Sequence, residues 1–508
     1  MPAGLLLSAS SGAISGGPTQ SGSFSLDIQV TDSSTPVQTA TKALPLSITS
    51  STGAGNAIPA TLFGMTVTYD QSLPTVPFGD LKGTELEWPY IEQTQGVYNW
   101  SNLDSWVSVA NAHNVPFHYS TAEAPPWAVS DQTSCDSGLI VIAGGEACSA
   151  DVTDLTDWNN FATALTQRYN GQNGHGFIAV YELYNEPEGF FTGDTANLVA
   201  QTVALYNAVR ANSPTSLVVG MGVTDPDTYY APGNYMDAYW AAGGVKTLDA
   251  VAFHGYAHSN NDVPEIVNTF VPYITAAMAR NGIPATTPIW DTSGSWGDVA
   301  MAGSNIDSDQ QAAWVARSYL LHWSDGVSRF NWYTWDGYPW GALWTSASGI
   351  DQAGVAYGQV YSWMVGATMS APCSASGTVW TCGLTKPGST QTLAVWNTAG
   401  SSAYTPAAQY RQYQDLSGNT SVITGGSVTI GIEPILLKTA STSEPLISVT
   451  PGSLAFGSVT IDDSGKQSLT VSNPGTASLS ITAANVTVSV FNTNGLSVPC
   501  LLYTSRCV

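Results

Sequence analysis

Residues 177–187 read FIAVYELYNEP, an apolar, strand-like run that ends in Asn185-Glu186-Pro187. A carboxylate at the end of a buried strand is costly unless a partner or a reaction uses it. In a barrel of alternating strands and helices, active sites form at the carboxyl ends of the strands. The stretch therefore predicts that Glu186 belongs to a functional site. The structural alternative is that Glu186 merely begins a helix, where the helix dipole favours an acidic residue.

Strand-like segments alternate with helical patterns on both sides of this stretch. We expect strands at 62–67, 83–88, 115–120, 178–184, 217–222, 250–254, 288–292 and 328–332, and helices most clearly at 103–111, 158–169, 196–211, 263–280 and 308–324. Eight such βα units predict an α/β fold of the (β/α)8 TIM barrel type. An open sheet is the alternative, but no GxGxxG motif follows the first strand. Glu186 then ends the fourth strand.

Segments rich in Gly, Ser and Thr flank the barrel. Period-two alternation in SFSLDIQVTD at 23–32 predicts strands, and short strands separated by turns follow residue 368. The expected domains are a partial Ig-like β module at 1–49, the barrel at 57–366, an accessory β-sandwich at 367–440, a partial Ig-like module at 445–499 and a tail at 500–508. The tail is out of register with the pattern before it, and we interpret it as artefactual. Both ends look incomplete, so the missing signal peptide says little about location.

The composition narrows the class of partner. The net charge is -24 with 13 Lys+Arg, which disfavours nucleic acid because an acidic surface repels phosphate. The chain has 17 Trp and 23 Tyr, whose flat faces suit neutral sugars, although many of these aromatic side chains are expected in the core. No stretch is apolar enough to span a membrane. We expect an oligo- or polysaccharide partner, a monomer and no cofactor.

The cysteines indicate an exported protein. Cys135 and Cys148 lie close together in a Gly/Ser-rich loop, and Cys373 and Cys382 flank a short predicted hairpin. Local pairs of this kind predict two disulfides and therefore an oxidising compartment. None of the cysteines forms a CxxC pair, which argues against a zinc site.

Two motifs resemble those of a known group of enzymes. Asn185-Glu186-Pro187 and the segment PIWDTSGSWG at 288–297 resemble the acid/base and nucleophile strands of clan A retaining glycoside hydrolases, closest to family 39. The resemblance covers about residues 62–439, and the end segments resemble bacterial Ig-like surface modules. Retaining cleavage needs two carboxyl groups about 5 Å apart. The resemblance implies that Glu186 is the acid/base on the fourth strand, and it places the nucleophile after the seventh.

Ser293 stands where the resemblance calls for a nucleophilic glutamate. A serine hydroxyl is too weakly acidic to attack without a base, and it carries no charge to stabilise a cationic transition state. Three explanations remain open: an engineered replacement, a natural protein that only binds sugar, or a displaced nucleophile. Asp291 is the obvious substitute on the same strand face. It lies deeper and its side chain is shorter, so we expect a structural role for it.

The other site candidates follow the ends of the predicted strands. The resemblance implies that Asn185 binds the sugar hydroxyl next to the anomeric carbon, that His254 and Tyr256 orient the nucleophile, and that Trp335 lies beneath the sugar. A purely structural role is the alternative for His254, and core packing is the alternative for Trp332. His254 and His258 have no evident third ligand, so we expect no metal. The remaining substrate-binding candidates are Glu85 and Glu87, where many clan A enzymes have an Arg, together with His118, Glu123 and Trp127.

These observations predict a secreted or cell-surface bacterial glycoside hydrolase. It is expected to act with retention on β-linked plant or bacterial glycans and to be largely inactive because Ser293 replaces the nucleophile. The alternative is a catalytically silent carbohydrate-binding surface protein.

Overall fold

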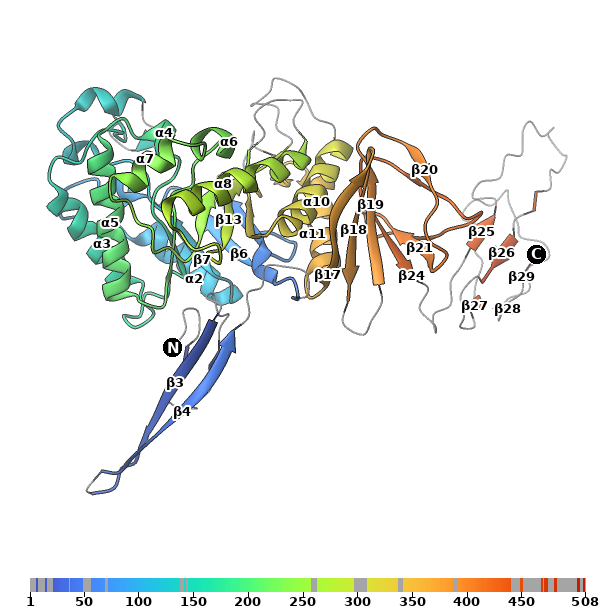
Figure 1. The fold of residues 1–508 in the computed structure, drawn as a ribbon, viewed down its shortest axis with the longest axis horizontal. Coiled ribbons are helices and arrows are strands. Elements are labelled where there is room, and N and C mark those ends of the chain that lie inside the picture. The colour runs from blue at the N-terminus through green and yellow to red at the C-terminus, as the bar shows by residue number, and fades with distance from the viewer. Residues whose placement is uncertain are drawn as a thin grey trace. The chain divides into compact units, whose positions relative to one another are not determined.

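The chain forms two compact units, Met1–Cys373 and Ser374–Val508, in a computed structural model (Figure 1). The structure describes residues 6–7, 14–15, 22–35, 37–48, 56–68, 72–137, 141–142, 145–256, 263–296, 308–336, 341–386, 391–439, 448–450, 467–468, 470–473, 479–481, 500–502 and 506–507. Among these residues, no helix combines the length and the apolar character needed to cross a membrane.

Eight parallel strands form a barrel in the first unit. They are β5 (Phe63–Val67), β6 (Asp80–Gly83), β7 (Phe117–Ser120), β10 (Val180–Glu182), β11 (Leu217–Val219), β12 (Val251–Phe253), β13 (Ile289–Gly294) and β14 (Val327–Trp332). β14 pairs back onto β5, and a parallel bridge between Val219 and Ala250 joins the last two neighbours, β11 and β12. The predicted (β/α)8 barrel is confirmed.

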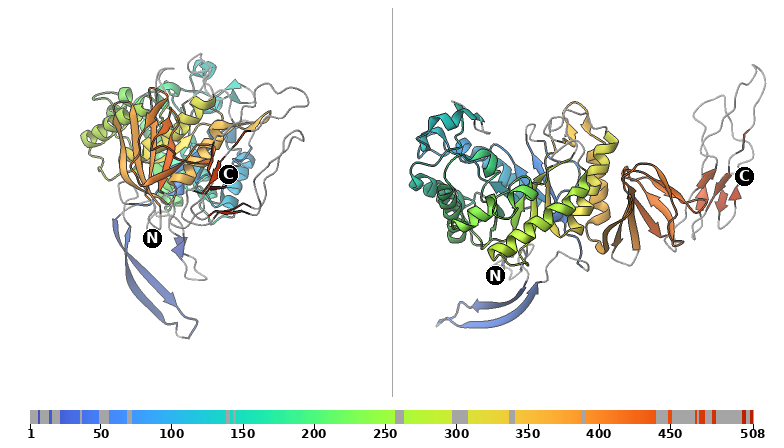
Figure 2. Two further views of the ribbon diagram at one scale, coloured as in Figure 1. Left: turned by 90° about the vertical axis from the view of Figure 1, so that its right-hand side faces the viewer. Right: turned by 45° about the horizontal axis from the view of Figure 1, so that its top comes forward.

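Helices surround the strands (Figures 1 and 2). In α3, Trp158, Phe161 and Leu165 recur at helical spacing and are buried, and the Asp154 side chain caps the helix by accepting from the Thr156 N–H. The longer helices are α2 (Ser101–His113), α3 (Leu155–Arg168), α5 (Thr195–Asn212), α8 (Val267–Asn281), α10 (Ser308–Ser324) and α11 (Gln352–Met364). Shorter ones are α1 (Trp88–Ile91), α4 (Pro187–Phe190), α6 (Pro226–Tyr229) and α7 (Tyr235–Ala241).

The second strand lies earlier in the chain than the alternation in 83–88 predicts. β6 spans Asp80–Gly83, and Trp88 already begins α1. Asp80 and Lys82 are both buried, and each forms ion pairs with residues of other strands. Asp80 and Lys82 place two charges in the core, so β6 lacks an apolar pattern, and the alternation in 83–88 predicts the strand too late in the chain.

The interior of the barrel changes character along the strands. Apolar side chains from four adjacent strands pack together in one cluster, namely Val180, Leu217, Val219, Ala250, Ala252 and Trp290. Glu182 follows Val180 on the same face of β10 and faces charged and polar partners instead. Polar side chains therefore gather toward the carboxyl ends of the strands.

The second unit begins within β17 and contains a β-sandwich, as predicted. One sheet has the order β17 (Thr368–Ser376), β18 (Val379–Thr385), β19 (Gln391–Asn397), β24 (Ile435–Thr439), β21 (Tyr410–Gln414), β22 (Thr420–Val422), and the other pairs β20 (Ser402–Tyr404) with β23 (Val428–Ile430). The core between the sheets is formed by residues such as Val395, Ile430 and Leu437.

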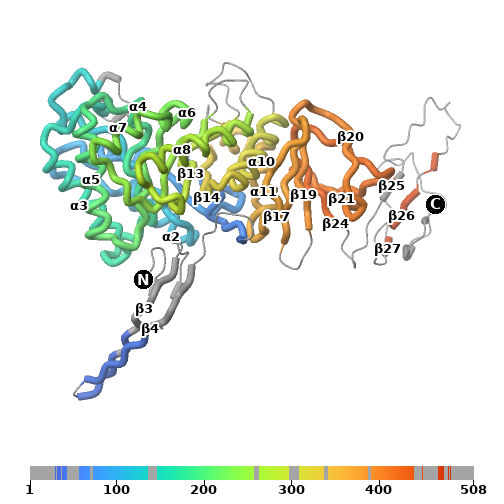
Figure 3. The backbone as a smooth tube through the Cα atoms, in the orientation of Figure 1, coloured from blue at the N-terminus to red at the C-terminus, as the bar shows by residue number. Residues whose placement is uncertain are grey.

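Small β elements lie at both ends of the chain (Figure 3). Near the N-terminus, β3 (Gly22–Thr31) and β4 (Thr39–Ile48) form a long antiparallel hairpin. Near the C-terminus, β25 (Ser448–Thr450) and β26 (Thr470–Ser472) pair, and β27 (Leu479–Ile481) follows. The segments Cys500–Leu502 and Arg506–Cys507, which the sequence assigns to an artefactual tail, pair with β27 and β26 as β28 and β29.

Candidate active site

Glu186 lies just beyond the carboxyl end of β10, at the residue before α4. Its backbone has φ 45° and ψ 53°, the left-handed region that a non-glycine residue rarely adopts. The backbone N–H donates to the Gly222 carbonyl over 2.8 Å, which ties this turn to the chain that follows β11. The Glu186 side chain is 18% exposed. A strained turn that presents a partly open carboxyl group is typical of functional sites.

His254 connects Glu186 to a second, fully buried carboxylate. Its Nδ1 lies 2.6 Å from Glu186 Oε1, and its Nε2 lies 3.4 Å from Glu182 Oε1. Burial disfavours the charged imidazolium, but the hydrogen bonds and charges of Glu182 and Glu186 outweigh it and raise the pKa of His254 to about 9. At neutral pH, His254 is therefore positively charged and donates to Glu186.

Glu182 is the centre of a buried ionic network that the sequence analysis missed. Lys82 Nζ lies 2.7 Å from its Oε2, His118 Nε2 lies 3.2 Å from the same oxygen, and the Thr292 hydroxyl donates to Oε1 over 2.6 Å. Burial opposes ionisation, but Lys82 and the two imidazoles outweigh it and hold the pKa of Glu182 well below its usual value. The signal was present in the sequence, since a carboxylate within an apolar strand needs buried partners.

Ser293 and Tyr256 meet at the ends of β13 and β12. The two hydroxyl oxygens are 2.6 Å apart, and Ser293 is 5% exposed. Burial and the nearby Glu186 charge raise the pKa of Tyr256 well above its ordinary value, so the phenol keeps its proton. The pairing of β13 with β14 is irregular between Asp291 and Gly294, and Ser293 lies within this irregular segment.

Asp291 faces the helical layer. It is fully buried, and its Oδ2 lies 2.8 Å from Nε2 of His322 on α10. This placement favours the structural role expected for Asp291 over that of a displaced nucleophile.

Three other candidates lie in the loops that follow β7 and β10. Asn185 is partly exposed, and its backbone N–H donates to the Thr121 carbonyl. Glu123 is buried, and its backbone N–H donates to the Tyr184 hydroxyl oxygen. Trp127 is partly exposed, and its indole N–H donates to the Glu92 carbonyl over 2.7 Å. These loops therefore place an amide and an aromatic ring where solvent reaches them.

The four further candidates differ in how open they are to a ligand. Glu85 is exposed, while Glu87 accepts from the Leu86 N–H and burial raises its pKa. His118 and Trp335 are both 0% exposed, and His118 lies beneath the site, against Glu182. Trp332 is core, as its indole N–H donates to the Gly341 carbonyl. His258 lies outside the described residues.

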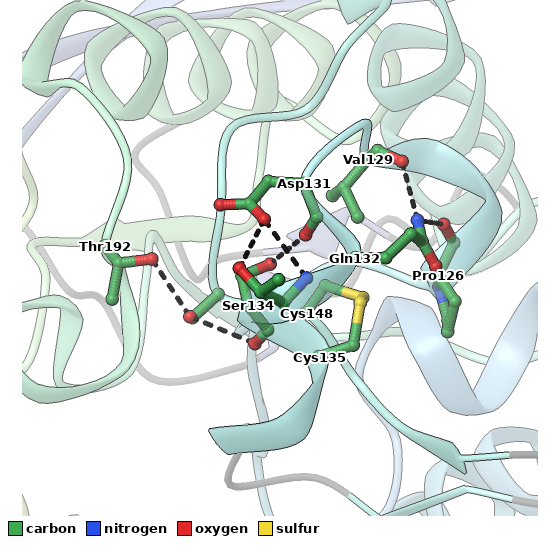
Figure 4. Close-up of a disulfide and its surroundings, with 10 residues drawn as sticks. Pro126, Val129, Asp131, Gln132, Ser134, Cys135, Cys148 and Thr192 are labelled. Carbon is green, nitrogen blue, oxygen red and sulfur yellow. Dashed lines mark hydrogen bonds between the residues drawn. A yellow bond between two sulfur atoms is a disulfide. The ribbon is translucent and has the colours of Figure 1, made fainter.

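A disulfide between Cys135 and Cys148 closes the loop after β7, as predicted (Figure 4). The Gln132 amide donates to the carbonyls of Pro126 and Val129, and the hydroxyl groups of Ser149 and Thr192 lie 3.1 Å apart. These contacts fix the loop that carries Trp127. Cys373 and Cys382 are also disulfide-bonded.

Comparisons with known proteins agree with this architecture. The family model described as "Putative Ig domain" matches residues 1–50, and no curated protein matches the sequence. Among solved structures, the chain is similar to a family 39 glycoside hydrolase from Bacteroides cellulosilyticus WH2, with 17% identity and a TM-score of 0.57 over 84% of this chain and 89% of that one. It is also similar to a glucosidase from Croceicoccus marinus, with 12% identity and a TM-score of 0.52 over 77% and 98%.

A conserved exported protein from Bacteroides fragilis is a further structural neighbour, with 10% identity and a TM-score of 0.50 over 75% of this chain and 91% of that one. At these identities the likeness establishes architecture rather than activity. The chain therefore has the fold of clan A glycoside hydrolases, with an Ig-like module at its N-terminal end.

Proposed function

We propose that the barrel is the site of a retaining glycoside hydrolase for β-linked plant or bacterial glycans, with Ser293 at the position of the nucleophile. The observation that carries the proposal is the contact between Ser293 and Tyr256, 2.6 Å apart at the strand ends next to the loop that holds Glu186. A tyrosine hydroxyl there would donate to a carboxylate at position 293. Glu186 would protonate the departing sugar oxygen, and the residue at 293 would attack the anomeric carbon.

The serine form is expected to bind glycan and to turn it over very slowly. A serine nucleophile needs a neighbouring base to accept its proton. Among the described residues, the hydrogen-bond partner of the Ser293 hydroxyl is the Tyr256 phenol, whose raised pKa keeps it protonated and so unable to act as that base. Asp291 accepts from the backbone N–H of Ser293, not from its hydroxyl, and is itself engaged by His322.

Charge also favours a glutamate at this position. His254 carries a positive charge at neutral pH and pairs with Glu186. In a retaining enzyme, the negative nucleophile raises the pKa of the acid/base so that it holds a proton before the bond breaks. Serine supplies no such charge, whereas a glutamate at position 293 would.

Restoring the carboxylate tests the proposal. Ser293→Glu should hydrolyse aryl β-glycosides of at least one pentose or hexose, and Ser293→Gln, which has the same size without the charge, should remain inactive. Glu186→Gln in the Ser293→Glu background should abolish the gain for substrates with poor leaving groups. Azide or formate should partly restore cleavage in the serine form, because a small anion can occupy the space left by the shorter side chain.

The carbohydrate-binding alternative makes a different prediction for the same proteins. If Ser293→Glu stays inactive on every β-linked pentoside and hexoside, while the serine form binds glycan in titration calorimetry, the chain is a binding protein and the hydrolase proposal is wrong. A screen of both forms against plant and bacterial polysaccharides would then identify the glycan.

A further inference from the structure

Asp291 and His322 form a buried pair outside the chemistry proposed above. Both side chains are 0% exposed, and they join β13 to α10 through the 2.8 Å contact between Oδ2 and Nε2. Neither has an open path to a ligand in this structure. A buried ion pair or shared proton is weak support for stability alone, because desolvation offsets much of the attraction.

His322 is held in one orientation. Its Nδ1 lies 2.7 Å from the carbonyl oxygen of Ser318, one turn earlier on α10, and its ring stacks on Phe330 at 4.0 Å with the planes 4° apart. A carbonyl oxygen can only accept, so Nδ1 carries a hydrogen. The imidazole therefore fixes the plane and position of the Asp291 carboxyl group.

The other oxygen of Asp291 joins the ends of two strands. Oδ1 accepts from the backbone N–H of Gly255 over 3.1 Å and from that of Ser293 over 3.3 Å. Gly255 directly precedes Tyr256, so a single carboxyl oxygen anchors the backbone beside both members of the Ser293–Tyr256 contact.

The sequence around the pair leaves room for this approach. A Cβ atom added at Gly255 would overlap Oδ2 of Asp291, and one added at Gly294 would come within 2.8 Å of the same oxygen. Real Cβ atoms essentially never approach so closely, so any larger residue would displace the carboxyl group. Glycine at both positions allows the carboxyl group to reach the two strand ends.

From these contacts we infer that Asp291 and His322 are positioning residues, which set the separation and direction of Ser293 and Tyr256. This inference rests on the proposed function, because it takes residue 293 to be at the position of the nucleophile. Neither residue touches the substrate. The pair acts through the backbone at 255 and 293, and so it determines whether a residue at 293 is aligned with Tyr256.

Asp291→Asn and Asp291→Ala separate positioning from charge. The amide oxygen of an asparagine can accept from both backbone N–H groups, and its NH2 group can donate to Nε2 of a neutral His322 whose hydrogen is on Nδ1. Every hydrogen bond is therefore kept while the charge is lost. Alanine removes the acceptor from two backbone donors and leaves Nε2 without its partner.

The test uses two measurements on the full chain. In crystal structures of the serine form, the distance between the Ser293 and Tyr256 hydroxyl groups should stay near the 2.6 Å seen here in Asp291→Asn and should lengthen in Asp291→Ala. In the Ser293→Glu background, Asp291→Ala should lower kcat about 100-fold with KM changed by less than about threefold, since a misplacement of about 1 Å has that effect. Asp291→Asn should lower kcat by less than about fivefold on the same reasoning.

Tyr319→Phe is the matched control on the same helix. Its hydroxyl donates to the backbone carbonyls of Gly64 and Phe330, so the variant loses buried hydrogen bonds without touching the Asp291 pair. It should lower the unfolding temperature and leave kcat unchanged.

The outcomes separate this inference from the proposed function. An unchanged hydroxyl distance together with an unchanged kcat in Asp291→Ala would overturn the positioning role. If Ser293→Glu is inactive, the proposed function fails, and the crystallographic distance alone then decides the positioning role. If Asp291→Ala does not fold, His322→Gln can be used for the same two measurements. We expect the same longer hydroxyl distance and the same loss of kcat. If both stay unchanged, the positioning role of the pair is wrong.

Discussion

His254→Gln should remove a pH-dependent part of the free energy of unfolding. His254 is fully buried between two carboxylates, 2.6 Å from Glu186 and 3.4 Å from Glu182. These contacts raise its pKa from the usual 6.5 to about 9, despite the opposing effect of burial. Glutamine has a comparable reach, but it cannot take up the proton.

The sign follows from the direction of the shift. The folded state binds the proton more tightly than the unfolded state does, so the stabilisation is complete below about pH 6.5 and is lost as the pH rises through about 9. The difference of about 2.5 pH units corresponds to about 3 kcal/mol. Relative to His254→Gln, the native chain should therefore lose about 3 kcal/mol of stability between pH 6 and pH 10.

Urea unfolding followed by tryptophan fluorescence measures this difference. Other groups also titrate in this range, so the informative quantity is the free-energy gap between the native chain and the variant at each pH. His113→Gln is the control, because His113 is exposed at the end of α2. A constant gap for His254→Gln would refute the charged imidazole that lies between Glu186 and Glu182.

Three further changes test the scaffold around the site. Lys82→Met should lower the free energy of unfolding in urea by about 3–5 kcal/mol, because it leaves the Glu182 carboxylate buried without its ammonium partner. Adding Glu182→Gln should recover part of this loss. If the losses of the two single variants simply added, the pairing would be contradicted. Gly222→Ala should destabilise the barrel by about 1–3 kcal/mol because the new methyl group overlaps the Glu182 carboxylate, which a thermal melt would show. Replacing Cys135 and Cys148 together by serine should cost about 3 kcal/mol for a loop with a sequence separation of 13, which a thermal melt without reductant would show.

The sequence was sufficient for the barrel because its strands have simple patterns. Apolar runs such as the one that begins at Ile178 alternate with amphipathic helices such as α3, and both signals are local. The position of Glu186 beyond the fourth strand and of Ser293 on the seventh follows from counting these runs. Counting strands needs no knowledge of side-chain contacts, and therefore the sequence alone was enough to place Glu186 and Ser293 on their strands.

The ionic network beneath the site could not be found in this way. Lys82 meets Glu182 across a sequence separation of 100, and Thr292 meets it across 110. Each residue looks misplaced in its own strand, and only the closed barrel brings the partners together. The same cause shifted the second strand, since Asp80 and Lys82 made β6 look exposed when both side chains are buried.

Loss of the carboxylate at position 293 removes the nucleophile of the proposed catalytic pair and leaves Glu186 as its remaining member. Glu186 Oε1 lies 2.6 Å from Nδ1 of His254, and the role proposed for Glu186 is to protonate the departing sugar oxygen. That role matters only where the leaving group needs a proton. In the serine form, replacing Glu186 by Gln should therefore weaken azide rescue of alkyl glycosides and leave that of dinitrophenyl glycosides, whose leaving group departs without a proton, unchanged. If azide rescued both kinds of substrate equally well in Glu186→Gln, the acid role of Glu186 would be wrong.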